Sequence, residues 1–472
     1  MDPLAEPEAH EEPEVEVDPQ LTNVVQGFTR GSLLTPDALV DPDASTTPFH
    51  NAADTDPALP TNRAWGREIL ARVEASRLGV ATIDAARIDS TDQLDDVIDG
   101  VRTAAAAWGA RPGDQRAALL HRVGVAIERN RARLIEVMAS ETGKTIAEAD
   151  PEVSEAVDFA HYYAERARDL DRVQGARFVP SRVTVVAPPW NFPVAIPAGS
   201  MLAALASGSG VVVKPAGQAA DPAPCWSRRS ARPACRGSLL ALVDAGEAEF
   251  GEHLIAHPSV DRVILTGGYE TAEVFRSWRS DLPLLAETSG KNAIIVTPSA
   301  DLDLAAADVV KSAFGHAGQK CSAASLVILV GSVGRSRRFL TQLTDAVSSL
   351  RVGYPSDPTT QMGPIIEPAA GKLKHALTQL GVGEKWLVEP EAKDETGRLW
   401  SPGVRDGVKP GSYFHLTEFF GPVLGVMRAR NLEEGHPLPE RDPVRPHRGP
   451  AQPRRARGSS SGSRPWRRAT ST

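Results

Sequence analysis

The chain has 472 residues, of which 41% are hydrophobic and 24% charged, and its formal net charge at pH 7 is -8. This composition is typical of a soluble globular protein with two or three domains. The acidic balance argues against a general nucleic-acid-binding protein, because phosphate neutralisation needs a surplus of lysine and arginine. The three cysteines make no disulfide framework and no pair has zinc-finger spacing, so no metal site is expected.

Residues 1–60 are acidic and rich in proline, with few apolar positions, so we expect a mobile arm there. The chain starts without the basic and apolar regions of a signal peptide. A stretch of about 18 or more apolar residues, as a membrane span needs, is also missing. These features indicate a cytoplasmic protein.

Helical periodicity follows the arm. From Trp65 to Val73 the apolar residues recur on one face of a helix. Further helices are predicted at residues 93–108, 116–142 and 152–170. Gly143 is a suitable stop for the second of these. We interpret them as packing helices with solvated charges.

Strands and helices alternate from residue 182 onwards. Strands are predicted at residues 182–187, 210–214, 262–266, 284–287 and 292–297, and an apolar helix at 198–206. Apolar β-branched strands separated by helices predict a parallel sheet that is covered on both faces. Such sheets bind ligands beyond the carboxyl ends of their strands, so the residues that follow each strand are the candidates for a site.

Several of these residues carry useful chemistry. Asn191, in the proline-rich turn PPWNFP, has an amide that can point inward. Lys214 ends a strand, where a surface lysine is as good an interpretation as a ligand contact. Gly267 and Gly268 form a strand-to-helix turn whose N–H groups attract phosphate, although a diglycine turn alone is weak evidence. Glu287 ends an apolar strand, where a partly buried carboxylate is costly unless it is paired or acts as a general base.

Cys321 lies in the stretch AFGHAGQKCSAAS, residues 313–325. The glycines before it let the backbone approach a ligand closely, and the small residues after it leave room above the thiol. A substrate could therefore reach a nucleophilic sulfur. The alternative is a buried core cysteine, as most lone cysteines are. Only partners elsewhere in the chain can decide between the two.

Six motifs occur in one order along the chain: PPWNFP, the KP of GVVVKPA, LTGG, AETSGKN, GQKCSA and EFFGPV. Together they resemble the aldehyde dehydrogenase superfamily. The separation of Glu287 and Cys321, 34 residues, is similar to the family's own spacing of base and nucleophile. Within the superfamily the chain looks most like the L-glutamate γ-semialdehyde (Δ1-pyrroline-5-carboxylate) dehydrogenases, in particular those in the C-terminal half of bifunctional proline-catabolic enzymes.

The resemblance implies an α/β fold with a Rossmann-type NAD-binding domain and an α/β catalytic domain. We expect helices and the NAD-binding domain at residues 61–290 and the catalytic domain at 291–433. It further implies that Cys321 is the nucleophile and that the Asn191 amide holds the oxyanion together with the Cys321 N–H. Glu287 would activate the water that hydrolyses the thioester, and Ser322 would touch the substrate.

The resemblance also implies a dinucleotide site. Lys214 would bind the adenosine ribose, and Gly267 and Gly268 would lie near the pyrophosphate. Glu418 would bind the nicotinamide ribose, with Phe420 beside it. NAD is the cofactor expected from the subfamily, with NADP left open.

Two segments depart from the family pattern. Residues 219–237 are rich in proline and arginine where the family has an amphipathic helix, and we assign no role to their two cysteines. Residues 434–472 have no periodicity, where family members continue with the rest of the catalytic domain, a substrate-anchoring loop and a dimerisation arm. We therefore expect a C-terminally incomplete fold with a disordered tail. Translation out of frame is our hypothesis for both segments, and the nucleotide sequence tests it.

The expected activity is NAD-dependent oxidation of L-glutamate γ-semialdehyde to L-glutamate in proline degradation. The expected partner is a small aldehyde, with no nucleic acid or membrane, and the family is typically homo-oligomeric. An inactive remnant that still binds the dinucleotide is one alternative. An acyltransferase that passes the Cys321 thioester to coenzyme A is another, and a water-activating Glu287 disfavours it.

Overall fold

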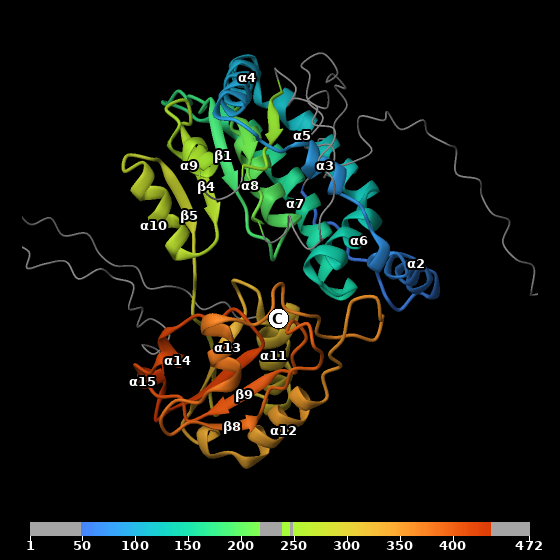
Figure 1. Ribbon diagram of the computed structural model, residues 1–472, viewed down its shortest axis with the longest axis vertical. Helices are drawn as coiled ribbons and strands as arrows, with labels where there is room; N and C mark the ends of the chain where they lie inside the picture. Colours follow the sequence, from blue (N-terminus) through green and yellow to red (C-terminus); the bar gives the residue numbers. More distant parts are fainter. Residues whose placement is uncertain (1–48, 218–237, 246–248, 436–472) are drawn as a thin grey trace, which may run out of the picture.

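The described part of the protein forms two α/β bodies. The computed structural model describes residues 49–217, 238–245 and 249–435. The segment 219–237, most of the expected arm and nearly all of the expected tail lie outside these residues. Figure 1 shows one body above the other, each built on a five-stranded sheet. Within the described ranges, no helix has both the length and the apolar character needed to cross a membrane.

The first body begins with a group of helices. The Ser90 hydroxyl caps the helix that begins at Thr91 by accepting the Gln93 N–H at 3.2 Å. Gly143 has a left-handed φ of 71° and ends a helix, as predicted. The helices are α2 (Pro60–Leu70), the 3-10 turn η2 (Val73–Ala75), α3 (Val80–Ala85), α4 (Thr91–Gly109), α5 (Gly113–Arg129), α6 (Arg131–Thr142) and α7 (Ile146–Arg172).

The single helix predicted at 116–142 is wrong, because Asn130 separates α5 from α6. The Asn130 backbone has φ −98° and ψ 11°, and its side-chain amide donates to the Ala126 carbonyl at 2.9 Å. A local side-chain bond of this kind offers the backbone an alternative to continuing the helix. After the break, Arg131 pairs with Asp150 on α7, with 3.0 Å between Nη1 and Oδ1.

Residues 49–59, which composition assigns to the arm, contact α7. The Ala52 N–H donates to Asp158 at 2.6 Å, and the N–H and hydroxyl of Thr55 donate to Asp150 at 2.6 and 2.7 Å. These bonds hold the end of the segment against the first body.

Five parallel strands form the first sheet, in the order β3-β2-β1-β4-β5. They are β1 (Val183–Ala187), β2 (Gly210–Val213), β3 (Leu240–Leu242), β4 (Arg262–Thr266) and β5 (Leu284–Glu287), and the helices between them are α8 (Ala195–Ala206), α9 (Glu249–Ala256) and α10 (Tyr269–Trp278). The four strands predicted here are confirmed, each to within one residue at either end.

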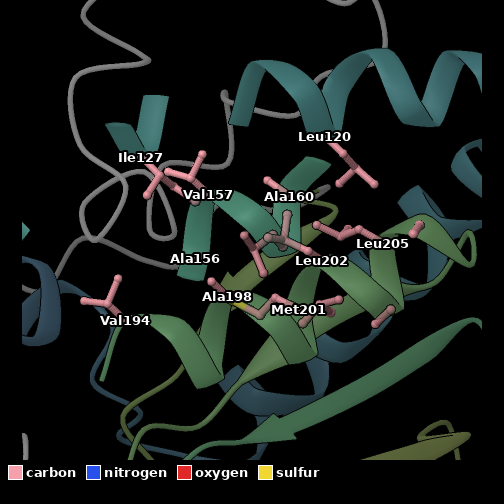
Figure 2. Close-up of a cluster of buried hydrophobic side chains, with 14 of the residues drawn as sticks. Leu120, Ile127, Ala156, Val157, Ala160, Val194, Ala198, Met201, Leu202 and Leu205 are labelled. Atoms are coloured by element: carbon pink, nitrogen blue, oxygen red, sulfur yellow. The ribbon is translucent and has the colours of Figure 1, made fainter. Parts of the chain in front are cut away.

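Alternate residues of the central strands enter two separate cores. Val186 and Val213 face the core made with α5, α7 and α8, whereas Val185 and Val212 face the core made with α4, α9 and α10. Figure 2 shows the first of these cores, where side chains of α5, α7 and α8 pack together. Strand side chains alternate between faces, so runs of valine are buried on both sides. The predicted sheet with two covered faces is confirmed.

The chain leaves the first sheet after β5 and enters the second body through residues 288–291. The strand predicted at 292–297 forms, but it lies in the second sheet and does not continue the first. The order of that sheet is β6-β7-β10-β9-β8, in which β8 pairs antiparallel with β9 and the other pairs are parallel. The strands are β6 (Asn292–Val296), β7 (Ala324–Val330), β8 (Lys385–Val388), β9 (Gly403–Asp406) and β10 (Val423–Ala429).

Helices cover both faces of the second sheet as well. Val327 and Leu329 of β7 face the core made with α11 and α12, and Leu326 and Ile328 face the core made with α13 and α14. The helical elements of this body are α11 (Leu302–Phe314), η4 (Gly315–Gly318), η5 (Val333–Arg335), α12 (Arg337–Ser348), α13 (Gly371–Thr378), α14 (Tyr413–Leu416) and α15 (Leu432–Gly435). The two covered sheets give the α/β fold expected from the sequence.

Candidate active site

The first sheet places most of the candidate residues along one edge. Asn191 follows β1, Lys214 follows β2, Gly267 and Gly268 follow β4, and Glu287 ends β5. All these strands run parallel, so their carboxyl ends meet at the same side of the sheet. This edge faces the second body, which supplies the remaining candidates (Figure 1).

Cys321 lies in a turn of the second body, between η4 and β7, and is exposed to solvent. The backbone before it is unusual, because His316 and Ala317 have φ of 49° and 53°. Left-handed conformations of non-glycine residues cost of order 1–3 kcal/mol each and gather at functional sites. Gly318 is also left-handed, and a Cβ at this position would overlap the Gly421 carbonyl oxygen. The turn before the thiol therefore accepts glycine and little else at residue 318.

The thiol of Cys321 and the carboxylate of Glu287 come from different bodies and interact electrostatically. The protein around the thiol raises its pKa by desolvation, and the negative charge of Glu287 raises it further. The backbone N–H groups of Ser322 and Cys321 act in the opposite direction by bonding to the sulfur. Ser322 itself is exposed beside the thiol. The sulfur thus bonds to two backbone donors and is subject to the negative charge of a carboxylate in the other body.

Glu287 differs from the expectation in one respect, since it is exposed and not partly buried. The reason lies in the sheet, because β5 is an edge strand with a neighbour on one side only. Leu285 on the same strand is 53% exposed. The carboxylate can therefore meet water as well as the thiol.

Asn191 is brought to the same turn. Its side chain is buried, and its amide donates to the Gln319 carbonyl at 3.0 Å, two residues before Cys321. The Gln319 side chain in turn accepts the Ile366 N–H at 3.0 Å. These bonds fix the loop after β1 against the cysteine turn.

A buried ion pair that sequence reasoning missed supports this loop from behind. Lys144 pairs with Glu152 on α7, both side chains are fully buried, and the Lys144 ammonium lies 3.8 Å from the centre of the Phe192 ring. The other carboxylate oxygen of Glu152 accepts the N–H groups of Val194 and Ala195 at 2.8 and 3.1 Å. Glu152 therefore anchors both the loop that carries Asn191 and the start of α8.

The same face of α7 reaches the cysteine turn. Glu148 pairs with Lys320, the residue before Cys321. Glu155 lies close enough for its charge to act on the Cys321 thiol, and burial raises the pKa of Glu155, with Glu152 adding to the shift. Residues 148, 152 and 155 are spaced by four and three, so they share one face of the helix. That spacing is the only sequence signal that could have identified this group.

Glu418 and Phe420 line a small pocket that opens to solvent, together with Gly290 and Asn292. The Glu418 carboxylate accepts the Gly290 N–H at 3.2 Å. Phe420 is left-handed, with φ 56°, and its ring meets Trp190 edge-on with 5.8 Å between the centres. The loop before β10 is thus joined to both the Glu287 segment and the loop after β1.

Lys291 is a further residue that the sequence analysis did not single out, although it lies in the motif AETSGKN. Its ammonium nitrogen is buried and has no hydrogen-bond partner among the described residues. It lies 4.3 Å and 5.0 Å from the ring centres of Phe414 and Phe419. Burial lowers the pKa of Lys291 to about 7, and the Glu418 charge partly offsets this shift.

The turn after β4 fits a phosphate in part. Gly267 has open space on its Cα, since a Cβ there would meet only Leu265, at 3.5 Å. The Gly267 N–H, however, donates to the Glu287 carbonyl at 3.1 Å, and the Tyr269 N–H donates to the Ser289 hydroxyl at 3.2 Å. A phosphate would therefore use the other N–H groups at the start of α10. Lys214 has its own N–H bonded to Val186 at 2.9 Å, which completes the ladder of β2.

One group of potential metal ligands occurs among the described residues, away from this site. It consists of Asp95 on α4, His253 on α9 and His257. Nε2 of His253 lies 2.6 Å and Nε2 of His257 3.3 Å from Oδ1 of Asp95. The Ser259 N–H donates to Nδ1 of His257, which leaves Nε2 as the protonated nitrogen that faces the carboxylate. This arrangement is a hydrogen-bonded clamp between two helices, and a metal would have to displace it.

Comparison with known proteins agrees with this architecture. The sequence pattern of the aldehyde dehydrogenase family matches residues 76–438. A 1-pyrroline-5-carboxylate dehydrogenase from Geobacillus sp. (strain WCH70) is 33% identical over 345 residues, which cover 69% of this chain and 67% of that protein.

Solved structures give the same result. Proline utilization A (PutA) from Corynebacterium freiburgense superposes with a TM-score of 0.73 and 46% sequence identity, over 84% of this chain and 40% of that one. A 1-pyrroline-5-carboxylate dehydrogenase from Thermus with bound NAD superposes with a TM-score of 0.71 and 26% identity, over 84% of this chain and 86% of that one. Matched by its sequence pattern over most of its length and by its fold, the chain belongs to the aldehyde dehydrogenase family.

Proposed function

We propose that the chain is an NAD-dependent dehydrogenase that oxidises L-glutamate γ-semialdehyde, the open form of Δ1-pyrroline-5-carboxylate, to L-glutamate. The observation that carries the proposal is the meeting of the two bodies at the cysteine turn, where the Asn191 amide donates to the Gln319 carbonyl and the charge of Glu287 raises the pKa of the Cys321 thiol. The named activities of the Geobacillus and Thermus relatives support the choice of substrate.

In the proposed reaction Cys321 is the nucleophile. Its pKa is raised, so near neutral pH the sulfur holds a proton that must be removed as it attacks. Water carries that proton to solvent while the S–C bond forms at the aldehyde carbon, so Glu287 remains ionised for the second half of the reaction. The developing oxyanion accepts hydrogen bonds from the Asn191 amide and the Cys321 N–H, and a donor of this kind contributes about 3 kcal/mol.

The second half of the reaction restores the thiol. A bound NAD supplies the hydride acceptor that converts the adduct into a thioester. Glu287 then takes a proton from water as the new O–C bond forms, and it passes that proton to the sulfur as the C–S bond breaks and the carboxylic acid is released. Exposure of Glu287 supports this step, because the base must reach water.

The dinucleotide would be held by residues of both bodies. Lys214 and the turn at Gly267 and Gly268 would bind its adenosine and pyrophosphate, and Glu418 with Phe420 its nicotinamide half. The open space at Gly267 and the pocket beside Glu418 support this assignment.

The test is formation of NADH by the purified chain given NAD and pyrroline-5-carboxylate, with propanal as a comparison substrate that lacks the amino and carboxylate groups. We expect turnover that is faster with pyrroline-5-carboxylate and is abolished in Cys321→Ser. Cys225→Ser, at a cysteine outside the described residues, is the matched control and should turn over normally. An unaltered rate in Cys321→Ser refutes the nucleophile, whereas tight NAD binding without turnover favours the inactive remnant.

A further inference from the structure

Asn292 is a residue that the proposed mechanism does not use, although it contacts the backbone of the nucleophile. It is the first residue of β6, where the chain enters the second body after Glu287 and residues 288–291. Its side-chain nitrogen donates to the Cys321 carbonyl, and also to the Ala323 carbonyl at 3.4 Å. Both neighbours are carbonyl oxygens, so the nitrogen of the amide must face them, and its two hydrogens serve the two bonds.

The pairing of β6 with β7 is irregular at the place where Asn292 contacts the cysteine turn. Asn292 pairs with Ala324 of β7, but the next residue, Ala293, pairs with Leu326. Ser325 is therefore an extra residue in β7. Such β-bulges re-aim a side chain, and they occur often beside active sites. Here the irregularity lies where the first side chain of β6 is directed at the turn before β7.

The Cys321 carbonyl and the Ser322 N–H belong to one peptide group. That group is planar and trans, so its C=O and N–H point in opposite directions. The Ser322 N–H bonds to the Cys321 sulfur, and this bond lowers the pKa of the thiol because it favours the thiolate. A side chain that fixes the carbonyl therefore also fixes the N–H that contacts the sulfur.

Ser312 on α11 holds the same turn at a different place. Its hydroxyl accepts the Ala324 N–H at 3.2 Å, three residues after the nucleophile. This bond does not act on the peptide between Cys321 and Ser322. A change at Ser312 therefore loosens the turn without releasing that peptide, which makes it a matched control for a change at Asn292.

We propose that Asn292 is a positioning residue, which holds the peptide between Cys321 and Ser322 so that the Ser322 N–H points at the sulfur. The proposal rests on the proposed function, since Cys321 is assigned as the nucleophile there. Asn292 acts through the backbone of the cysteine turn in this account and not on the aldehyde itself.

The experiment measures alkylation of Cys321 by iodoacetamide between pH 7 and 10, followed by mass spectrometry of the peptide that contains this cysteine. Asn292→Leu keeps the approximate size of the side chain and removes both donors. We expect the half-maximal rate at a higher pH than in the unmodified chain, because the thiolate loses an oriented N–H donor. At pH 8 alkylation should be about three- to tenfold slower. Where the thiol is fully ionised, alkylation should be at least as fast as in the unmodified chain.

Two further variants complete the comparison. Asn292→Ala also removes both donors and should give the same shift, which separates loss of the bonds from an effect peculiar to leucine. Ser312→Ala removes a hydrogen bond from the same turn and should leave the pH of half-maximal alkylation unchanged. Midpoints of urea unfolding, measured on the same proteins, establish that each variant is folded during alkylation.

Three outcomes overturn the proposal. The pH of half-maximal alkylation stays unchanged in both Asn292 variants, it rises equally in Ser312→Ala, or the rate falls by the same factor at every pH, as loss of access to the thiol requires. Alkylation needs neither NAD nor aldehyde, so this result is independent of turnover. If the shift occurs and the unmodified chain forms no NADH, the proposed function fails whereas the role of Asn292 in the cysteine turn is supported.

Discussion

The Cys321 thiol lies in surroundings that favour its protonated form. Desolvation and the Glu287 charge both raise its pKa, and the two backbone N–H groups that bond to the sulfur do not cancel them. The residue is therefore a nucleophile that depends on a base and not a stable thiolate.

Glu287→Gln should speed alkylation of the Cys321 thiol and slow oxidation of the aldehyde. Loss of the negative charge lowers the pKa of Cys321, so more thiolate is present at a given pH and alkylation by iodoacetamide at pH 8 becomes faster. Turnover of the aldehyde should fall by about 100-fold or more, as expected for loss of a general base. Slower alkylation in this variant would contradict the electrostatic contact.

Lys291 should make the free energy of unfolding depend on pH. Its pKa falls from 10.5 to about 7 in the folded protein, so between these values the unfolded chain binds a proton that the native protein has lost. The free energy of unfolding should therefore rise with pH across this range, by at most ~1.4 kcal/mol per pH unit from this group. Glu418 opposes the shift, and Arg405 and Lys372 add to it.

The matching measurement is urea unfolding of the unmodified chain and of Lys291→Met at several pH values between 6 and 10. The variant should lose this rise, and its gain in stability should be largest at the acidic end. A constant difference between the two proteins would show that Lys291 keeps the same protonation state folded and unfolded.

At the scale of elements, α7 supports the active-site loops. Its buried Glu152 neutralises Lys144 and accepts two N–H groups at the start of α8, and its Glu148 pairs with Lys320. Removing one partner of a buried ion pair destabilises a protein more than replacing both partners with apolar residues, because one charge is then left buried without a counter-charge.

Glu152→Gln should destabilise the protein by about 3–5 kcal/mol, because Lys144 remains charged and buried. The double change Lys144→Met with Glu152→Gln should recover most of this loss, since glutamine can still accept the Val194 and Ala195 N–H groups. Chemical denaturation of Glu152→Gln, of Lys144→Met and of the double variant measures both effects. Additive losses in the double variant would show that the pair is not coupled.

Local sequence patterns predicted some of the elements and missed one helix break. The valine runs of β1 and β2 and the apolar period of α2 identified these elements, because burial on two faces or on one stripe leaves a local pattern. The break at Asn130 was missed, since neither glycine nor proline marks it and its cause is a side-chain bond together with a partner on α7.

At the scale of the whole molecule, the candidate site joins residues that are distant in sequence. The strand-end rule identified Asn191 and Glu287 because parallel strands expose their carboxyl ends together. The exposure of Glu287 could not be predicted, since β5 becomes an edge strand only through the order of the sheet. Lys144, Glu152 and Lys291 were missed because their partners are set by packing and not by any motif.

The proposed reaction needs both bodies, because Glu287 ends β5 of the first sheet and Cys321 lies in the second body. The most direct test is to trap the intermediate that links them. Glu287→Gln is incubated with NAD and pyrroline-5-carboxylate, digested under acid conditions and analysed by mass spectrometry. The account predicts a single turnover of NADH and an acyl group bound to the peptide that contains Cys321. An acyl group on a different residue, or NADH formed with Cys321 unmodified in this variant, would contradict it.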